Sequence, residues 1–179
     1  DQAYNDALSA SQQIAALTAD YTFNGKLENP MTFNSVGNVT VLDVNGEIKL
    51  DGSETLTLTG SASDFFYVNV YGKYGMSGTS SIDLIGLSAA NVIFNILGGG
   101  DVSFSGDSHG RGTYLGVDSK FALNGNFLTG AVVGGRNEDI QITSGTQIYA
   151  AQAVAANAPG TLLMMGMAIS GLLARRRKA

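Results

Sequence analysis

The chain contains a single histidine, and the two residues before it are those of a hydrolase triad. Asp107, Ser108 and His109 stand side by side. A triad needs a hydrogen-bonded relay between side chains that the fold brings together, and neighbours on one turn do not normally form it. We therefore expect a solvated loop, no catalytic residue and a non-enzymatic protein. One histidine without any cysteine also cannot supply an ordinary zinc site, so we expect no metal and no cofactor.

Three aspartates lie among glycines between residues 98 and 118, where carboxylates on tight turns are able to bind calcium. They are Asp101, Asp107 and Asp118. Since no repeated Gly-Gly-x-Gly-x-Asp pattern accompanies them, ordinary polar turns are favoured and calcium binding is the alternative. The glycine run 98–100 is not a phosphate loop, because no Gly-Lys-Ser/Thr follows it.

An alternating segment, Thr55 to Thr59, presents a different surface chemistry. In a strand, Thr55, Thr57 and Thr59 would share the outer face, with Leu56 and Leu58 inward. A flat array of such threonines is the kind of surface that binds ice. One ladder is not a face, so ice binding is an alternative rather than the first hypothesis.

The body of the chain, residues 21–150, is predicted to be all-β. Short apolar segments end at Gly, Asn and Asp, as in Asn45-Gly46 after residues 39–44. No sharp repeat period is visible. Very short strands with Asn-Gly and Ser-Gly corners favour an irregular right-handed β-solenoid, and a β-sandwich is the second choice. Asn24, Asn45, Asn69 and Asn95 are expected to stack in ladders.

A helix is predicted at the N-terminus, within residues 1–20. Its spacings place small residues on one face that packs against the body. These residues are Ala3, Ala7, Ala10, Ile14 and Leu17.

Charge is divided between an acidic body and a basic tail. The first 157 residues carry 15 acidic and 6 basic residues, a net charge of −9, which argues against a nucleic-acid partner. The six basic residues look dispersed, which argues against a polysaccharide-acting enzyme on a β-solenoid. They are Lys26, Lys49, Lys73, Arg111, Lys120 and Arg136.

A linker at residues 151–160 precedes a tail, 161–179, that is predicted to be a hydrophobic helix in the membrane. The segment 162–174 carries no charge and includes Leu162, Leu163, Met164, Met165, Leu172 and Leu173. A basic cluster that would stop translocation follows at once, formed by Arg175, Arg176, Arg177 and Lys178. The apolar run is shorter than the ~20 residues of a comfortable span, which suits a temporary anchor.

The tail resembles the PEP-CTERM sorting signal of Gram-negative bacteria, in which a proline motif, a short apolar helix and an arginine cluster follow one another. The corresponding motif is Asn157, Ala158, Pro159, Gly160 and Thr161. The resemblance implies processing by an exosortase-type sorting enzyme.

The body resembles the choice-of-anchor A surface domain and, more distantly, the ice-binding-like adhesive domain DUF3494. The resemblance rests on the order of segments 41–44, 66–70, 91–96, 112–115 and 123–130. Together the patterns predict an exported cell-surface or extracellular-matrix protein with a structural or adhesive role. Its expected partners are the membrane, extracellular polysaccharide and neighbouring cells. An ice-binding protein is the alternative, and a polysaccharide-acting enzyme is a further one.

Overall fold

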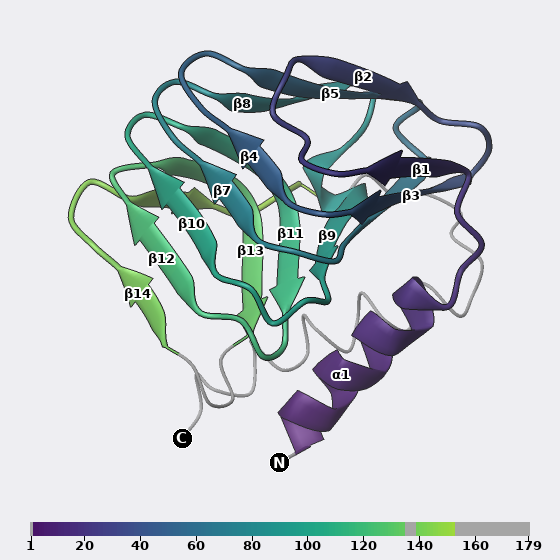
Figure 1. Cartoon of the computed structure of the whole chain (residues 1–179), viewed down its shortest axis with the longest axis horizontal. Coiled ribbons are helices and arrows are strands. Elements are labelled where there is room, and N and C mark those ends of the chain that lie inside the picture. Colours follow the sequence, from purple (N-terminus) through teal and green to yellow (C-terminus); the bar gives the residue numbers. More distant parts are fainter. Residues whose placement is uncertain (1, 135–138, 153–179) are drawn as a thin grey trace.

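The strands of this protein wind into successive coils, and the pairings among them are parallel (Figure 1). The structure is a computed structural model that describes residues 2–134 and 139–152. A β-sandwich is built from antiparallel sheets, so the second-choice fold is wrong. The predicted β-solenoid with an N-terminal helix is confirmed.

The coils have three sides, which we call faces a, b and c. Face a contains β1 (Tyr21–Asn24), β3 (Val39–Asn45), β6 (Phe65–Val70) and β9 (Val92–Ile96), and the second halves of β11 (His109–Gly116) and β13 (Phe127–Gly134). Face b contains β4 (Ile48–Leu50), β7 (Tyr74–Met76), β10 (Val102–Ser105), β12 (Phe121–Asn124) and β14 (Ile140–Ile142). Face c contains β2 (Met31–Asn34), β5 (Thr55–Thr59), β8 (Ser81–Ile85), the first halves of β11 and β13, and β15 (Gln147–Tyr149).

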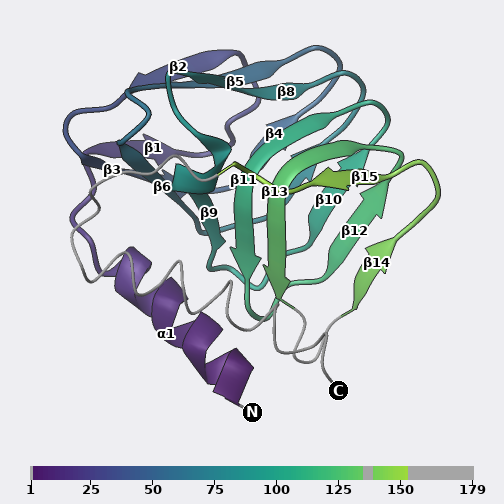
Figure 2. The same ribbon diagram turned by 180° about the vertical axis from the view of Figure 1, so that it is seen from behind.

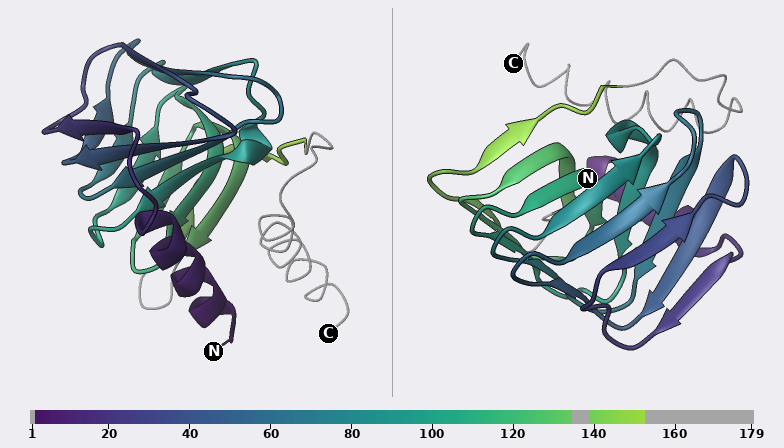
Figure 3. Two further views of the ribbon diagram at one scale, coloured as in Figure 1. Left: turned by 90° about the vertical axis from the view of Figure 1, so that its right-hand side faces the viewer. Right: turned by 90° about the horizontal axis from the view of Figure 1, so that it is seen from above.

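Strands β11 and β13 are long because each runs from face c round to face a. Figure 2 shows both from behind, and they join the two faces into one curled sheet. A short 3-10 turn, η1 (Ala89–Asn91), enters β9. The coils stack side by side along one axis, as the view from above in Figure 3 shows.

The coils differ in length, and this conceals the repeat in the sequence. On face a, β1 pairs with β3 at an offset of 21 residues, but the next coils are longer: Asn69 bonds Asp43 across 26 residues, and the pairing of β3 with β6 keeps the same offset. The late coils are shorter. Thr146 bonds Asn126 across 20 residues, and β11 pairs with β13 at a still smaller offset. No single period therefore runs through the chain.

The interior of the solenoid is filled by one apolar side chain from nearly every inward position. Its centre is an aromatic cluster of Tyr74, Phe94, Phe104 and Tyr114, with ring centroids 4.9 to 5.6 Å apart. All four rings are at most 1% exposed. Edge-to-face and stacked contacts of this kind add to the stabilisation from burial alone, so the core holds the outer faces rigidly.

A column of glycines marks the corner between faces b and c. One glycine per coil has a positive φ, between 61° and 87°, at Gly52, Gly78, Gly106, Gly125 and Gly145. The turns stack directly: a Cβ on Gly78 would lie 2.6 Å from the carbonyl oxygen of Gly52. Only glycine fits such a conformation without strain, so this column is the sequence signature of the coils.

Helix α1 (Gln2–Ala15) lies against face a (Figure 3). Ala7, Ala10 and Ile14 of the predicted stripe pack on the sheet beside Val41 and Tyr67. Leu17 does not, and its side chain is 41% exposed, because the helix ends at Ala15 and the helical spacing ends with it. The packing role predicted for this helix is confirmed.

The sorting motif (157–161), the apolar segment (162–174) and the basic cluster (175–178) lie outside the described residues. In the part of the chain that the structure describes, no helix has the length and apolar character needed to span a bilayer.

Candidate binding faces

The residues that resembled a triad lie where the chain enters β11, and their side chains do not come together. Ser108 is fully buried, whereas His109, the first residue of β11, is exposed and stacks on Phe127 with ring centroids 4.8 Å apart. Neighbouring side chains on a strand point to opposite sides. The hydroxyl and the imidazole therefore do not form a nucleophile–base pair.

The three aspartates proposed for calcium are also apart. Asp101 precedes β10 on face b, and Asp107 precedes β11 near the corner of faces b and c. Asp118 accepts a hydrogen bond of 3.3 Å from the hydroxyl of Tyr4 in α1. Within residues 2–134 and 139–152, no three His, Asp or Glu side chains lie close enough to hold a metal ion.

Face a is closed by the helix. A buried ladder of polar side chains joins the two: Ser11 bonds Asn95, the Asn95 amide donates to Asn69 at 2.9 Å, and the Asn69 amide donates to Asp43 at 2.9 Å. Asn45 donates to Asn24 in the same way at 2.9 Å. The predicted asparagine ladders therefore exist as two separate pairs. Faces b and c remain as surfaces for a ligand.

Face c carries threonines on two neighbouring strands, β2 and β5, and the adjacent strand β8 contributes Ser81, Asp83 and Ile85. Thr55, Thr57 and Thr59 point outward from β5, while Leu56 and Leu58 are fully buried, as the alternation predicts. The pairing of β5 with β2 and with β8 places further outward side chains next to these threonines. Thr32 lies beside Thr57, and Asp83 lies on its other side. The outward residues of β2, β5 and β8 form an array that we call the threonine grid: Thr32, Asn34, Thr55, Thr57, Thr59, Ser81, Asp83 and Ile85.

The threonine grid is mostly uncharged and is held on a rigid base. Asp83 is its single ionisable side chain, and Ile85 at its edge is 57% exposed. Thr55 and Ser81 exchange a hydrogen bond of 3.1 Å across two strands. The remainder of face c is bulkier, since β11 and β13 present His109, Arg111 and Phe127.

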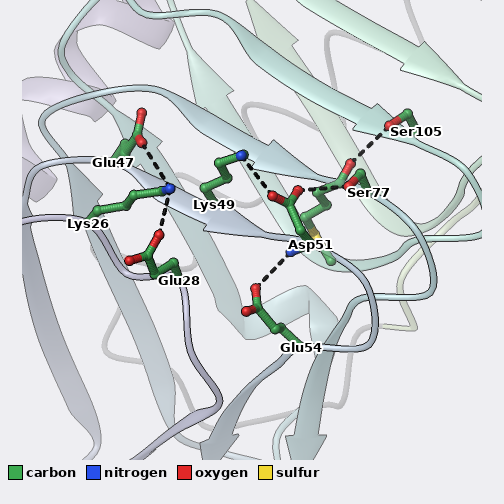
Figure 4. A network of polar contacts seen from close by, with 9 residues as sticks. Lys26, Glu28, Glu47, Lys49, Asp51, Glu54, Ser77 and Ser105 are labelled. Atoms are coloured by element: carbon green, nitrogen blue, oxygen red, sulfur yellow. Dashed lines mark hydrogen bonds and ion pairs between the residues drawn. The ribbon is translucent and has the colours of Figure 1, made fainter.

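Face b is charged instead (Figure 4). Lys49 pairs with Asp51 at 2.8 Å, and Lys26 pairs with Glu28 at 2.6 Å and with Glu47 at 3.9 Å. The Lys49 ammonium, followed by the Ser77 hydroxyl at 2.7 Å, lowers the pKa of the Asp51 carboxyl below its ordinary value. These groups are half exposed, so each pair contributes little to stability.

A shallow depression of about 420 Å³ lies in the middle of face b. Gly75 at its centre lacks a side chain, between Lys49 on β4 and Ser103 on β10. Ala122 on β12 continues the low floor. The rim is formed by charged side chains, namely Glu47, Lys49, Lys73, Asp101 and Lys120.

The charged character of face b was missed because its lysines look dispersed in the sequence. Four of the six basic residues of the body, Lys26, Lys49, Lys73 and Lys120, lie on this one face. Lys49 and Lys73 are separated by nearly one coil of sequence, and the stacking of the coils therefore brings them close together on face b. The glycine column is the signal that would have revealed this register.

Neither a protein-family model nor a curated protein sequence matches the chain. Solved structures do match. One is the crystal structure of an ice-binding protein from the Antarctic ascomycete Antarctomyces psychrotrophicus. It is 26% identical with a TM-score of 0.61, and the match covers 80% of this chain and 71% of that one.

A second neighbour is LeIBP, from an Arctic yeast. It is 18% identical with a TM-score of 0.55, and the match covers 87% of this chain and 64% of LeIBP, less than two thirds of its length. Both neighbours are ice-binding proteins. The ice-binding-like part of the resemblance drawn from the sequence is confirmed at the level of the fold, while the choice-of-anchor A and PEP-CTERM resemblances stay predictions.

Proposed function

We propose that this chain is an ice-binding domain and that its ice-binding surface is the threonine grid on face c. The observation that carries the proposal is the grid itself, on a fold that ice-binding proteins share. Parallel strands hold neighbouring side chains about 4.8 Å apart across the sheet and about 6.6 Å apart along each strand. Ice is a regular lattice, so a surface that binds it must repeat regularly too.

The chemistry of the grid suits ordered water. Threonine hydroxyls form hydrogen bonds with water, while their methyl groups and the Ile85 side chain do not hold water tightly. Threonine is branched at Cβ, and this stiffens χ1. Binding therefore costs little side-chain entropy. Face b is a poorer candidate, because its charges and the hollow at Gly75 interrupt a flat array.

We further propose that the domain is exported and held at the cell surface by the sorting tail. The support is the sequence of residues 157–179. An ice-binding domain anchored at the cell surface would attach the cell to ice, and this is the adhesive role that we propose.

The test uses the purified full-length chain and two bulky substitutions of equal size. Thr57→Tyr places a ring in the middle of the grid, and the matched control Ser103→Tyr places one in the middle of face b. We measure the fraction of protein taken up by a growing ice hemisphere and the shaping of single ice crystals. Circular dichroism verifies that both variants fold.

The expected result is uptake and crystal shaping by the wild type and by Ser103→Tyr, with loss of most of both in Thr57→Tyr. The opposite pattern would move the ice-binding surface to face b. A wild type that is excluded from ice as fully as a non-binding protein would overturn the function.

A further inference from the structure

A row of charges of alternating sign follows the axis of the solenoid along face b. Backbone hydrogen bonds set its register: Ile48 N–H donates to the Lys73 carbonyl, Tyr74 N–H to Asp101, Val102 N–H to Lys120 and Phe121 N–H to Asp139, each at 2.8 to 3.1 Å. Each coil therefore contributes one charge to the row. Leu27 N–H likewise donates to the Glu47 carbonyl, so the members of the row, in order, are Lys26, Glu47, Lys73, Asp101, Lys120 and Asp139.

The middle of this row is not neutralised by its own neighbours. The ion pairs of face b lie at its edge, on Lys26 and Lys49. Among the described residues, no ion pair shorter than 4.0 Å engages Lys73, Asp101 or Lys120. These three side chains form one long side of the depression over Gly75. Two cations and a carboxylate thus face the same hollow with their polar groups available to a ligand.

The mixture of signs restricts the class of ligand. Lys49, Lys73 and Lys120 attract an anion, but Glu47 and Asp101 repel one that carries nothing else. A matching ligand offers carboxylates to the lysines and hydroxyl donors to the carboxylates, at short intervals. It is also elongated, because the charges repeat about every 4.8 Å along the axis. An acidic sugar chain has all three properties.

We propose that the depression on face b binds an acidic polysaccharide, with Lys73 and Lys120 holding its carboxylates and Asp101 accepting hydrogen bonds from its hydroxyls. This site is distinct from the threonine grid and does not depend on ice binding.

The experiment measures binding of a polygalacturonate oligomer to the full-length chain by calorimetry at low salt. Neutral dextran, dextran sulfate and duplex DNA are the comparison ligands. The variants are Lys73→Gln with Lys120→Gln, and separately Asp101→Ala. The control is Lys26→Gln, which removes a lysine of the same face that is already paired with Glu28. Circular dichroism confirms folding in each case.

We expect the wild type to prefer polygalacturonate to all three comparison ligands. Loss of one charge-assisted hydrogen bond weakens binding about ten-fold, so the double lysine variant should lose about a hundred-fold and Lys26→Gln almost nothing. Asp101→Ala decides the mechanism. Weaker polygalacturonate binding supports the hydroxyl contact. Stronger binding would show simple attraction of polyanions and overturn the proposal, as would equal binding of dextran sulfate or DNA.

Discussion

The Ser11 hydroxyl in α1 donates a 2.7 Å hydrogen bond to Oδ1 of Asn95 in β9, across 84 residues of sequence. The Asn95 amide returns a hydrogen bond of 3.0 Å to the Ser11 carbonyl and another of 2.9 Å to Asn69. Both residues are buried. The side chain of Asn95 therefore has every hydrogen-bonding group occupied at the junction between the helix and face a.

Removing this junction should destabilise the protein strongly. Asn95→Ala leaves the Ser11 hydroxyl and the Asn69 side-chain carbonyl oxygen buried without these partners, at a cost of about 2–4 kcal/mol in the free energy of unfolding. Asn45→Ala breaks a bond of the same type at the exposed pair with Asn24, and should cost less than about 1 kcal/mol. Urea denaturation measures both. Equal costs would contradict a special role for the buried ladder.

Alanine substitution at three glycines, Gly37 and two members of the glycine column, separates two effects of adding a methyl group. Gly37 has open space and an ordinary φ, Gly52 has open space and a φ of +61°, and Gly78 has a φ of +67° and a carbonyl oxygen in the way. Substitution by alanine should be nearly neutral at Gly37 and cost about 1–2 kcal/mol at Gly52. It should cost more still at Gly78. Thermal unfolding gives the order, and a tolerated Gly78→Ala would contradict the direct stacking of the turns.

Buried tyrosines make the fold sensitive to alkali. Burial raises the pKa of Tyr67, under α1, to about 12, and it also raises the pKa of the core residues Tyr74 and Tyr114. A raised native pKa favours the neutral form, so the contribution of Tyr67 to stability is complete below pH 10 and is lost between pH 10 and about 12. Over this range, each such tyrosine makes the free energy of unfolding fall by about 1.4 kcal/mol per pH unit.

Substitution tests this assignment. In Tyr67→Phe, the free energy of unfolding should fall less steeply above pH 10, by the contribution of one tyrosine. Urea denaturation at several pH values measures this. The control is Tyr149→Phe, at a ring that is 53% exposed, and it should leave the slope unchanged. An unchanged slope in Tyr67→Phe would show that another group governs alkaline unfolding.

The two outer faces should act independently. Thr57→Tyr on face c should bind polygalacturonate with the wild-type affinity, within experimental error. The double lysine variant on face b should be taken up by ice as the wild type is. The rigid core lies between the two surfaces, and distant sites without shared partners have additive effects. Loss of both activities in either variant would indicate one shared site or a damaged fold.

Local patterns were enough to predict the secondary structure of several segments. The alternation from Thr55 to Thr59 placed its threonines outward, and short strands with glycine corners predicted a solenoid. The register between coils was not predictable in the same way, because the longer coils give way to shorter ones after β9. Consequently Lys73 and Lys120 looked remote from each other. Ser11 was missed as well, since a serine on a helix gives no sign of a partner 84 residues away.

A three-sided solenoid allows its surfaces to change separately. An outward residue of β5 touches neither α1 nor the rim of the depression, so one substitution alters one position of one face. Adding or removing a whole coil is different, because it lengthens or shortens the helix-bound, charged and threonine-bearing sides together. Point mutations therefore tune which ligand each side recognises, whereas the number of coils sets how long a stretch of ligand all sides can cover.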